Sequence, residues 1–226
     1  EIAHEKAGII KKDKTVVIGE TQKELEDVFI NKAKDLGSKI IFADKVLYKV
    51  YPTDLRGSFQ KKNIQTSLCV IKELQKSDWS IDEKSIKSGL LNVADNTGFK
   101  GRWTELNHSP LTICDTAHNK EGLTIVLEDV QSLDYSKLHF VIGFVEDKDL
   151  SSIIDLFPEN ASYYFCKPNI ARGLDVLILK GMFESKLRFG EAYSSVTKAY
   201  EAAKSSADKN DVIYIGGSTF VVSEII

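Results

Sequence analysis

An acid, an imidazole and an amide follow directly after an apolar run in the middle of the chain. The run is Leu111–Cys114, and the three side chains are Asp115, His118 and Asn119. A carboxylate at a strand end can bind ribose hydroxyls, and a histidine can contact an anion or a developing charge. Asp115 and Asn119 are equally suited to cap a following helix, so the spacing alone leaves both interpretations open.

Two glycines and a serine form a second group of this kind near the end of the chain. Gly216-Gly217-Ser218 follows the apolar run Val212–Ile215. Glycine lets a backbone approach a ligand closely, and the free N–H groups at a helix start attract carboxylate or phosphate. A plain turn with Ser218 as the helix cap explains the same residues. The glycine spacing does not match the Gly-x-Gly-x-x-Gly dinucleotide fingerprint.

Four further polar positions suit related chemistry. Arg102 offers a planar, permanently charged fork for a phosphate or a base face. Lys6 lies between an acid and an apolar run, where burial would lower its pKa. The Asn63 amide could read an adenine edge or cap a helix, and the segment 147–149 (Asp-Lys-Asp) could hold a charged ligand. Each position also has a plain surface or capping interpretation.

The elements that must position these residues follow from the apolar periodicity after residue 98. The pattern alternates strands over 111–114, 138–143, 161–166, 188–193 and 212–215 with helices over 120–133, 150–157, 174–186, 195–206 and 219–226. Such alternation with continuous apolar strands predicts an α/β fold with a mainly parallel sheet covered on both faces. The carboxyl ends of parallel strands share one edge, where we expect Asp115, His118, Asn119, Asp147, Lys148, Arg172 and Ser218.

The first part of the chain has a looser pattern. It predicts strands over 15–19, 39–43 and 45–51 and helices over 22–36, 60–75 and 81–94. Turn residues at 95–98 mark a domain boundary. We therefore predict two domains, 1–97 and 98–226.

Composition excludes several classes of protein. The net charge is −3 with no basic block, which argues against a nucleic-acid partner. No apolar run approaches the ~20 residues that span a bilayer, and no signal peptide opens the chain. Cys69, Cys114 and Cys166 are far apart and odd in number, which indicates reduced thiols and not a disulfide framework or a zinc site. We expect a cytoplasmic protein without a membrane partner.

Five motifs follow one another along the chain: Ile2-Ala-His-Glu-Lys-Ala-Gly-Ile-Ile-Lys11, Phe99-Lys-Gly-Arg102 with Ile113-Cys-Asp-Thr-Ala-His-Asn119, the segment Gly143–Asp149, Ile170-Ala-Arg172, and Gly216-Gly-Ser218. In this order they resemble the motifs of the folylpolyglutamate synthase and dihydrofolate synthase family, within the Mur ligase superfamily. The resemblance implies a Rossmann-like C-terminal ligase domain over 98–226, preceded by the C-terminal part of the ATP-binding central domain over 1–97.

The resemblance also implies a reaction and its participants. ATP with Mg²⁺ would convert a substrate carboxylate to an acyl phosphate, which the amine of L-glutamate attacks. The acceptor would be a folate or dihydropteroate, and the enzyme a monomer. Lys6 would carry a carbamate that helps hold magnesium. Asn63, Arg102 and Asp115 would contact ATP, while His118 and Ser218 would lie where glutamate meets the acyl phosphate.

The chain departs from the family pattern in three respects. It contains no Gly-x-x-x-x-Gly-Lys-Ser/Thr phosphate loop, so we expect part of a longer protein that is inactive alone. Phe99-Lys100 replaces a common Leu-Pro, and Thr116 replaces a glycine, which should stiffen the loop after Asp115. Two alternatives remain: another Mur-type amino-acid ligase of cell-wall synthesis, or a non-catalytic nucleotide-binding module.

Overall fold

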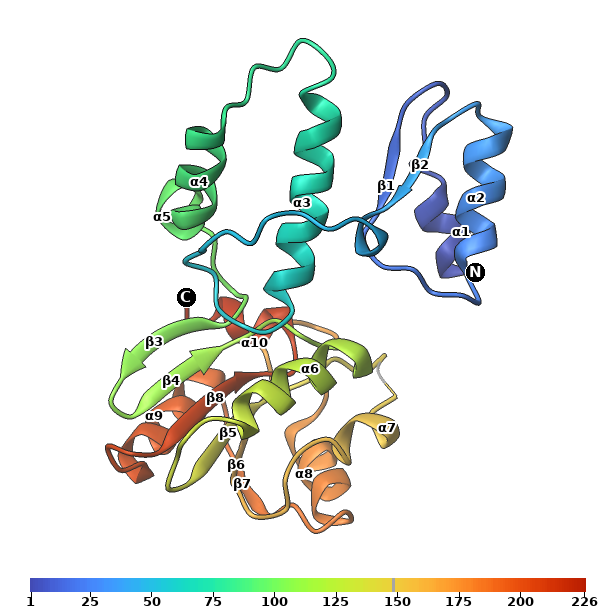
Figure 1. Ribbon diagram of the computed structural model, residues 1–226. Coiled ribbons are helices and arrows are strands. Elements are labelled where there is room, and N and C mark those ends of the chain that lie inside the picture. Colours follow the sequence, from blue (N-terminus) through green and yellow to red (C-terminus); the bar gives the residue numbers. More distant parts are fainter. Residues whose placement is uncertain (148) are drawn as a thin grey trace. The chain divides into compact units, whose positions relative to one another are not determined.

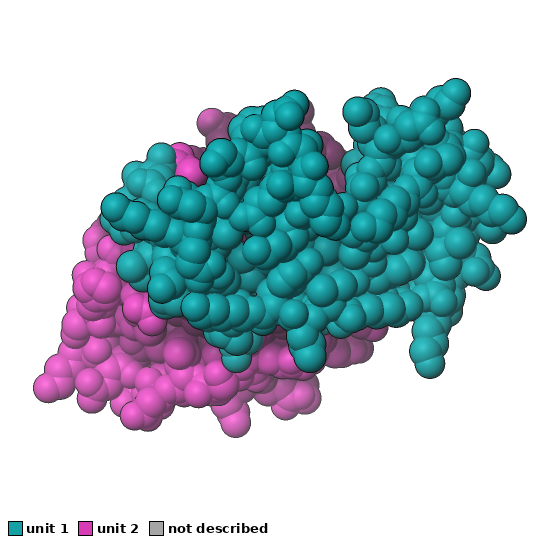
Figure 2. Space-filling view, turned by 45° about the horizontal axis from the view of Figure 1, so that its top comes forward, with its two compact units in different colours: residues 1–54, 59–96 teal, residues 55–58, 97–226 magenta. Residues whose placement is uncertain are grey.

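The computed structural model describes residues 1–147 and 149–226, so Lys148 lies outside the described residues. The chain forms two compact units, which are coloured separately in Figure 2. One comprises Glu1–Asp54 with Phe59–Asn96, and the other comprises Leu55–Ser58 with Thr97–Ile226. No helix in the described part of the chain is both long and apolar enough to traverse a lipid bilayer.

A six-stranded sheet forms the centre of the second unit (Figure 1). Its strands are β3 (Thr104–His108), β4 (Leu111–Cys114), β5 (Leu138–Ile142), β6 (Ser162–Phe165), β7 (Gly190–Ala192) and β8 (Val212–Gly216), in the order β3-β4-β8-β5-β6-β7. The β3–β4 pair is antiparallel and the other pairs are parallel. The predicted, mainly parallel α/β fold is confirmed.

Helices cover both faces of this sheet. They are α6 (Lys120–Gln131), α7 (Ser151–Ile154), α8 (Val176–Glu184), α9 (Val196–Ser206) and α10 (Thr219–Ser223). Figure 1 shows α6 and α9 on opposite faces. Buried residues of α9 and α10 pack with Ile213 and Ile215 of β8. Every residue of β5 and β8 is buried, which explains why these strands are largely apolar, with His139 of β5 as an exception.

Aromatic side chains form a second buried cluster in this unit. Its rings belong to Phe140, Phe144, Phe157, Tyr163, Phe165, Phe183 and Tyr214. Phe183 of α8 lies 5.3 Å from Phe165 between ring centroids, and Phe140 lies 5.8 Å from Tyr214. Such dense ring packing holds the strands, and hence the edge that they share, in fixed register.

The first unit contains a small parallel sheet and five α-helices among its described residues. The helices are α1 (Ile2–Ala7), α2 (Glu26–Asp35), α3 (Gln60–Leu74), α4 (Glu83–Leu91) and α5 (Val93–Thr97), the last ending in the second unit. The strands β1 (Val16–Ile18) and β2 (Ile40–Phe42) pair with Val16 opposite Ile40.

The predicted strand over 45–51 is wrong. A 3₁₀ turn at Ala43–Lys45 is followed by irregular chain. The segment has the alternating pattern of a strand, but it packs on no sheet of the described residues. Two of its apolar side chains therefore stay in solvent: Leu47 is 96% exposed and Val50 is 90% exposed. Tyr51 packs instead in a small cluster with Leu68 and Ile86.

Candidate functional site

The parallel register brings the segments after β4, β5, β6 and β8 to one edge of the sheet. Cys114 is opposite Ile215, and Ile142 is opposite both Gly216 and Phe165. The hydrogen bonds continue beyond the strands, because the Asp115 N–H donates to the Ile215 carbonyl. The expected gathering of polar segments at this edge is therefore observed, apart from Lys148, which is not described.

Asp115 lies beneath the surface of this edge. Its side chain is 1% exposed, and its two oxygens accept the backbone N–H groups of Trp103 at 2.8 Å and Ala117 at 2.7 Å. Burial raises the pKa of this carboxyl, although both hydrogen bonds and the Arg102 guanidinium act in the opposite direction. In this arrangement Asp115 joins two loops, and its predicted contact with ATP stays a prediction.

The loop before β3 is held against the loop after β4 and directs Arg102 outward. The Gly101 carbonyl accepts the N–H and the hydroxyl of Thr116, each at 2.9 Å. Gly101 has φ +86°, and a Cβ there would lie 3.0 Å from the Thr116 methyl. The hydroxyl bond is one that a glycine at 116 could not make. Arg102 is exposed on this fixed loop.

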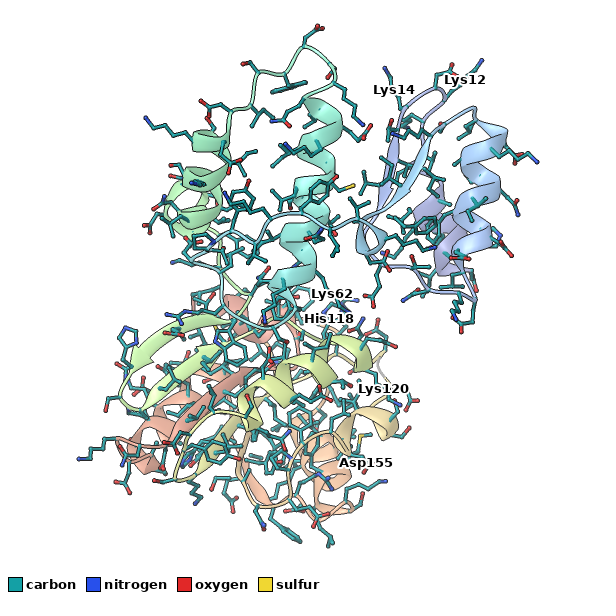
Figure 3. The ribbon with its side chains drawn as sticks, viewed as in Figure 1. Lys12, Lys14, Lys62, His118, Lys120 and Asp155 are labelled. Carbon is teal, nitrogen blue, oxygen red and sulfur yellow. The ribbon has the colours of Figure 1, made fainter. Side chains whose placement is uncertain are left out.

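His118 projects from the start of α6, as Figure 3 shows. Its Nδ1 lies 3.0 Å from the Thr116 carbonyl oxygen. Because a carbonyl only accepts, Nδ1 must carry the proton, which leaves Nε2 of the neutral ring free to accept one. Asn119 caps α6 by accepting the Gly122 N–H at 2.9 Å, so its capping interpretation is confirmed.

Ser218 begins α10 and is 3% exposed. Its hydroxyl oxygen accepts the Phe220 N–H at 3.2 Å, which leaves its own proton available to donate. Gly217 has φ +89°, and a Cβ there would lie 2.8 Å from the Gly143 carbonyl oxygen. Glycine is therefore required for the loop after β8 to pass the loop after β5.

A pocket of about 290 Å³ opens among these segments. It is lined by His118, Val145, Asp147, Arg172, Ser218, Thr219 and Phe220, all within the second unit. The structure thus brings His118 and Ser218 together, with a pair of opposite charges from two further loops.

Arg172 and Asp147 face each other in this pocket. The Arg172 Nη1 lies 3.6 Å from the Asp147 Oδ2, and both side chains are 60% exposed. The guanidinium carbon lies 5.3 Å from the centre of the Phe220 ring. Sequence reasoning assigned Phe220 no role. The sequence feature that could have identified Phe220 is its position two residues after Ser218, in the first turn of a helix at the sheet edge.

The thiol next to Asp115 is not suited to nucleophilic chemistry. Burial, with a contribution from the Asp115 charge, raises the pKa of the Cys114 thiol to about 12. Cys114 therefore stays protonated at neutral pH and packs in the core. This agrees with the expectation of reduced thiols.

The two remaining predicted residues belong to the first unit. Lys6 is exposed on α1. Asn63 lies in the first turn of α3, where its side-chain amide donates to Gln60 Oε1 at 3.0 Å. Among residues 1–147 and 149–226, no cluster of three or more His, Cys, Asp or Glu side chains is arranged to bind a metal ion. The predicted carbamate of Lys6 would add oxygen ligands that the plain side chains lack.

Comparisons with known proteins point to one family. Residues 101–219 match the family model "Mur ligase, glutamate ligase domain". The chain is 31% identical over 75% of its length to a probable bifunctional folylpolyglutamate synthase/dihydropteroate synthase of Haloferax volcanii, and covers 20% of that protein. It is 28% identical over its whole length to the dihydrofolate synthase/folylpolyglutamate synthase of Buchnera aphidicola subsp. Acyrthosiphon pisum, and covers 56% of it.

The fold is likewise similar to a solved bifunctional folylpolyglutamate synthase/dihydrofolate synthase with Mn, AMPPNP and L-glutamate bound. The TM-score is 0.82 at 23% identity, over 99% of this chain and 55% of that one. The chain thus spans about half the length, or less, of the relatives that it matches.

Proposed function

We propose a function from one premise: the chain belongs to the Mur ligase family, whose glutamate ligase domain it contains at residues 101–219. We propose that it is part of an enzyme that joins L-glutamate to a folate, or to dihydropteroate, at the expense of ATP. The names of the matched relatives support the folate class of acceptor. The L-glutamate, AMPPNP and manganese in the similar solved structure support the other participants.

The observation that carries the proposal is the pocket at the carboxyl edge of the sheet. It joins an imidazole with a free nitrogen, a hydroxyl that can donate, and an Arg–Asp pair within the region that the family model matches. Its volume of about 290 Å³ is near the lower limit of small-molecule pockets, ~300–1,000 Å³. That size suits an amino acid and is small for a whole folate or nucleotide.

The proposed reaction has two steps. The substrate carboxylate oxygen attacks the terminal phosphorus of ATP, which gives an acyl phosphate and ADP. The amine nitrogen of glutamate then attacks the acyl carbon, the bond from that carbon to the phosphate oxygen breaks, and inorganic phosphate leaves. The attacking amine must lose its extra proton. His118 Nε2, the nitrogen left free by the bond to Thr116, accepts that proton, and the Ser218 hydroxyl donates to a developing negative charge.

The remaining predicted residues have nucleotide and metal roles in this proposal. Arg102 is directed outward and binds phosphate or the base face, and Asp115 fixes the loop that carries it. Asn63 would contact ATP, and a carbamate on Lys6 would help hold Mg²⁺. When bound, magnesium would neutralise the charge of the phosphates. The proposed enzyme is a monomer.

The chain of 226 residues should not turn over by itself, since it spans about half of its relatives and contains no phosphate-loop motif. Formation of ADP and of a glutamylated product should occur only in the full-length protein that carries this chain. Turnover by the 226-residue chain would contradict this part of the proposal.

His118→Gln in that full-length protein tests the site. Removal of a proton acceptor typically lowers kcat by ~10²-fold or more. His108→Gln is the matched control, because His108 is an exposed histidine of the same unit that does not line the pocket. A panel of folates, dihydropteroate and nucleotide-linked peptides separates the folate ligase from a cell-wall ligase. Nucleotide binding without product on any acceptor would indicate a non-catalytic module.

A further inference from the structure

We propose that Thr116 is a positioning residue whose side-chain hydroxyl keeps the Arg102 guanidinium free for its ligand. The inference rests on the proposed function for what Arg102 then binds, a phosphate or the base face of a nucleotide. It adds the residue that makes the guanidinium available and the hydrogen bond through which it does so. Thr116 itself touches no reacting group in this proposal.

The Gly101 carbonyl is the point at which Thr116 and Arg102 meet. It accepts the Thr116 N–H and the Thr116 hydroxyl, each at 2.9 Å, and the Nη1 group of Arg102 at 3.2 Å. A carbonyl oxygen has two lone pairs, so these three donors compete for it. The guanidinium makes the longest of the three contacts. The hydroxyl therefore prevents Arg102 from binding its own backbone firmly.

This competition lowers the cost of moving Arg102 to a ligand. When an anion draws the guanidinium away, the Gly101 carbonyl keeps both donors of Thr116. Gly101 and Thr116 are buried, so water is poorly placed to replace a missing donor. Without the hydroxyl, the guanidinium would take its place, and a ligand would have to break a hydrogen bond from a charged donor. Such bonds are stronger than those between neutral groups.

Other hydrogen bonds hold this loop in shape, so the hydroxyl is not needed for the fold. The Gly101 N–H donates to Thr104 Oγ1 at 2.9 Å, and the Trp103 N–H donates to Asp115 at 2.8 Å. The bond from the Thr116 N–H would also remain. Removal of the hydroxyl alone should therefore change the position of the guanidinium and leave the backbone of the loop in place.

The effect on Arg102 can be separated from an effect on the rest of the site. The Thr116 carbonyl accepts the Nδ1–H of His118 at 3.0 Å, and the Ala117 N–H of the same peptide group donates to Asp115 at 2.7 Å. Neither bond uses the Thr116 side chain. His118 should consequently keep its proton on Nδ1 when only the hydroxyl is removed, and it serves as an internal reference.

Thr116→Val and Thr116→Ala test the inference in the 226-residue chain. Valine keeps the branched shape, alanine makes no steric demand, and both lack the hydroxyl. NMR of the Arg102 guanidinium measures how firmly it is held, and rotation about its Nε–Cζ bond should be slower in both variants than in the wild type. Thr116→Ser restores the hydroxyl and should restore the wild-type rotation. The ¹⁵N shifts of the His118 ring should be the same in all four proteins.

Thr124→Val is the matched control. Thr124 belongs to α6 of the same unit, and its hydroxyl donates to a backbone carbonyl, that of Lys120, at 2.8 Å. It loses the same kind of hydrogen bond at a carbonyl that Arg102 does not share. Rotation of the Arg102 guanidinium should stay at the wild-type rate in this variant.

The ADP affinity of the full-length protein measures the consequence for ligand binding. Thr116→Val and Thr116→Ala should bind ADP about fivefold more weakly, the equivalent of one ordinary hydrogen bond, and Thr116→Ser should bind as the wild type does. In an Arg102→Gln background the same substitutions should have no further effect, because the guanidinium on which the hydroxyl acts is absent. A merely structural role for Thr116 would weaken ADP equally in both backgrounds.

The possible results are distinct. Unchanged or faster guanidinium rotation in both hydroxyl-free variants, or an equal loss of ADP affinity with and without Arg102, would overturn the inference. A change of the His118 tautomer in Thr116→Val and Thr116→Ala would overturn it too, since the effect would then reach beyond Arg102. A wild-type full-length protein that binds no ADP would refute the nucleotide role in the proposed function. The rotation measurement, which needs no nucleotide, would still decide whether the hydroxyl controls the guanidinium.

Discussion

Asp115→Asn should release the loop that carries Arg102 while leaving the core of the sheet intact. The carboxylate accepts two buried backbone N–H groups, at 2.8 Å and 2.7 Å. The neutral amide has one acceptor atom, so one N–H would face another donor. An unsatisfied buried donor costs ~1–3 kcal/mol.

The lower half of that range is the better expectation. Burial raises the pKa of Asp115 despite both hydrogen bonds, so the charge itself opposes folding at neutral pH, and the neutral amide removes that cost. We therefore expect a loss of about 1–2 kcal/mol in the free energy of unfolding for Asp115→Asn. Asp115→Ala leaves both donors unpaired and should lose about twice as much.

Urea unfolding measures the total loss, and amide hydrogen exchange locates it. The Trp103 and Ala117 amides should lose protection, while amides of β5 and β8 should change only in proportion to global stability. Asp155→Asn is the control, because this carboxylate is exposed and contacts Lys186 at 3.2 Å; Figure 3 labels Asp155. Unchanged protection at Trp103 and Ala117 in both Asp115 variants would refute the structural role assigned here.

Two further predictions concern buried polar groups of the same sheet. The His139 ring hydrogen-bonds Asp211 Oδ2 at 3.1 Å and the Tyr164 hydroxyl at 3.0 Å, and burial lowers its pKa from the ordinary 6.5. The unfolded chain therefore binds a proton first, so the free energy of unfolding should decrease as the pH falls below about 6.5 and down to the lowered value. His139→Gln should reduce that slope, and an unchanged slope would exclude His139 as its source. The buried Tyr214 hydroxyl has no hydrogen-bond partner among the described residues, so Tyr214→Phe should be neutral or stabilise by about 1 kcal/mol. A clear loss of stability in thermal unfolding would show that the hydroxyl has a partner.

The strand–helix alternation was predictable because the physics that produces it is local. β5 and β8 are buried on both faces, so apart from His139 they carry no charged or hydrogen-bonding polar residue other than Tyr214, and their apolar pattern predicts strands in the sequence. The segments after each strand are polar for a related reason, because the chain leaves the buried core where a strand ends. His118, Ser218 and Arg172 were therefore predicted to share an edge, and they share a pocket.

Features that depend on distant contacts were not predictable. The position of β8 between β4 and β5 depends on the packing of the whole sheet. The segment 45–51 has the residue pattern of a strand, but it pairs with no other strand in the part of the chain that the structure describes. The burial of Asp115 depends on a backbone N–H twelve residues away in sequence, at Trp103, whose φ of 46° is unusual for a non-glycine residue.

Burial divides the predicted site residues into two kinds, and this division changes where ligand contacts should be sought. Asp115 and Ser218 are 1% and 3% exposed. Asp115 accepts one backbone N–H group from its own loop and one from the loop before β3, and Ser218 accepts one from the first turn of α10. Arg102 and His118 are exposed on the loops that Asp115 and Thr116 hold in place. A carboxylate whose oxygen atoms already accept backbone hydrogen bonds is poorly placed to bind a ligand directly. An exposed guanidinium or imidazole on a fixed loop is restricted in position but can still form hydrogen bonds with a ligand. Substitution of Asp115 should consequently impair ligand binding through Arg102. In a double variant, the loss of ligand affinity should therefore be close to that of the Asp115 variant alone and smaller than the sum of the two single losses.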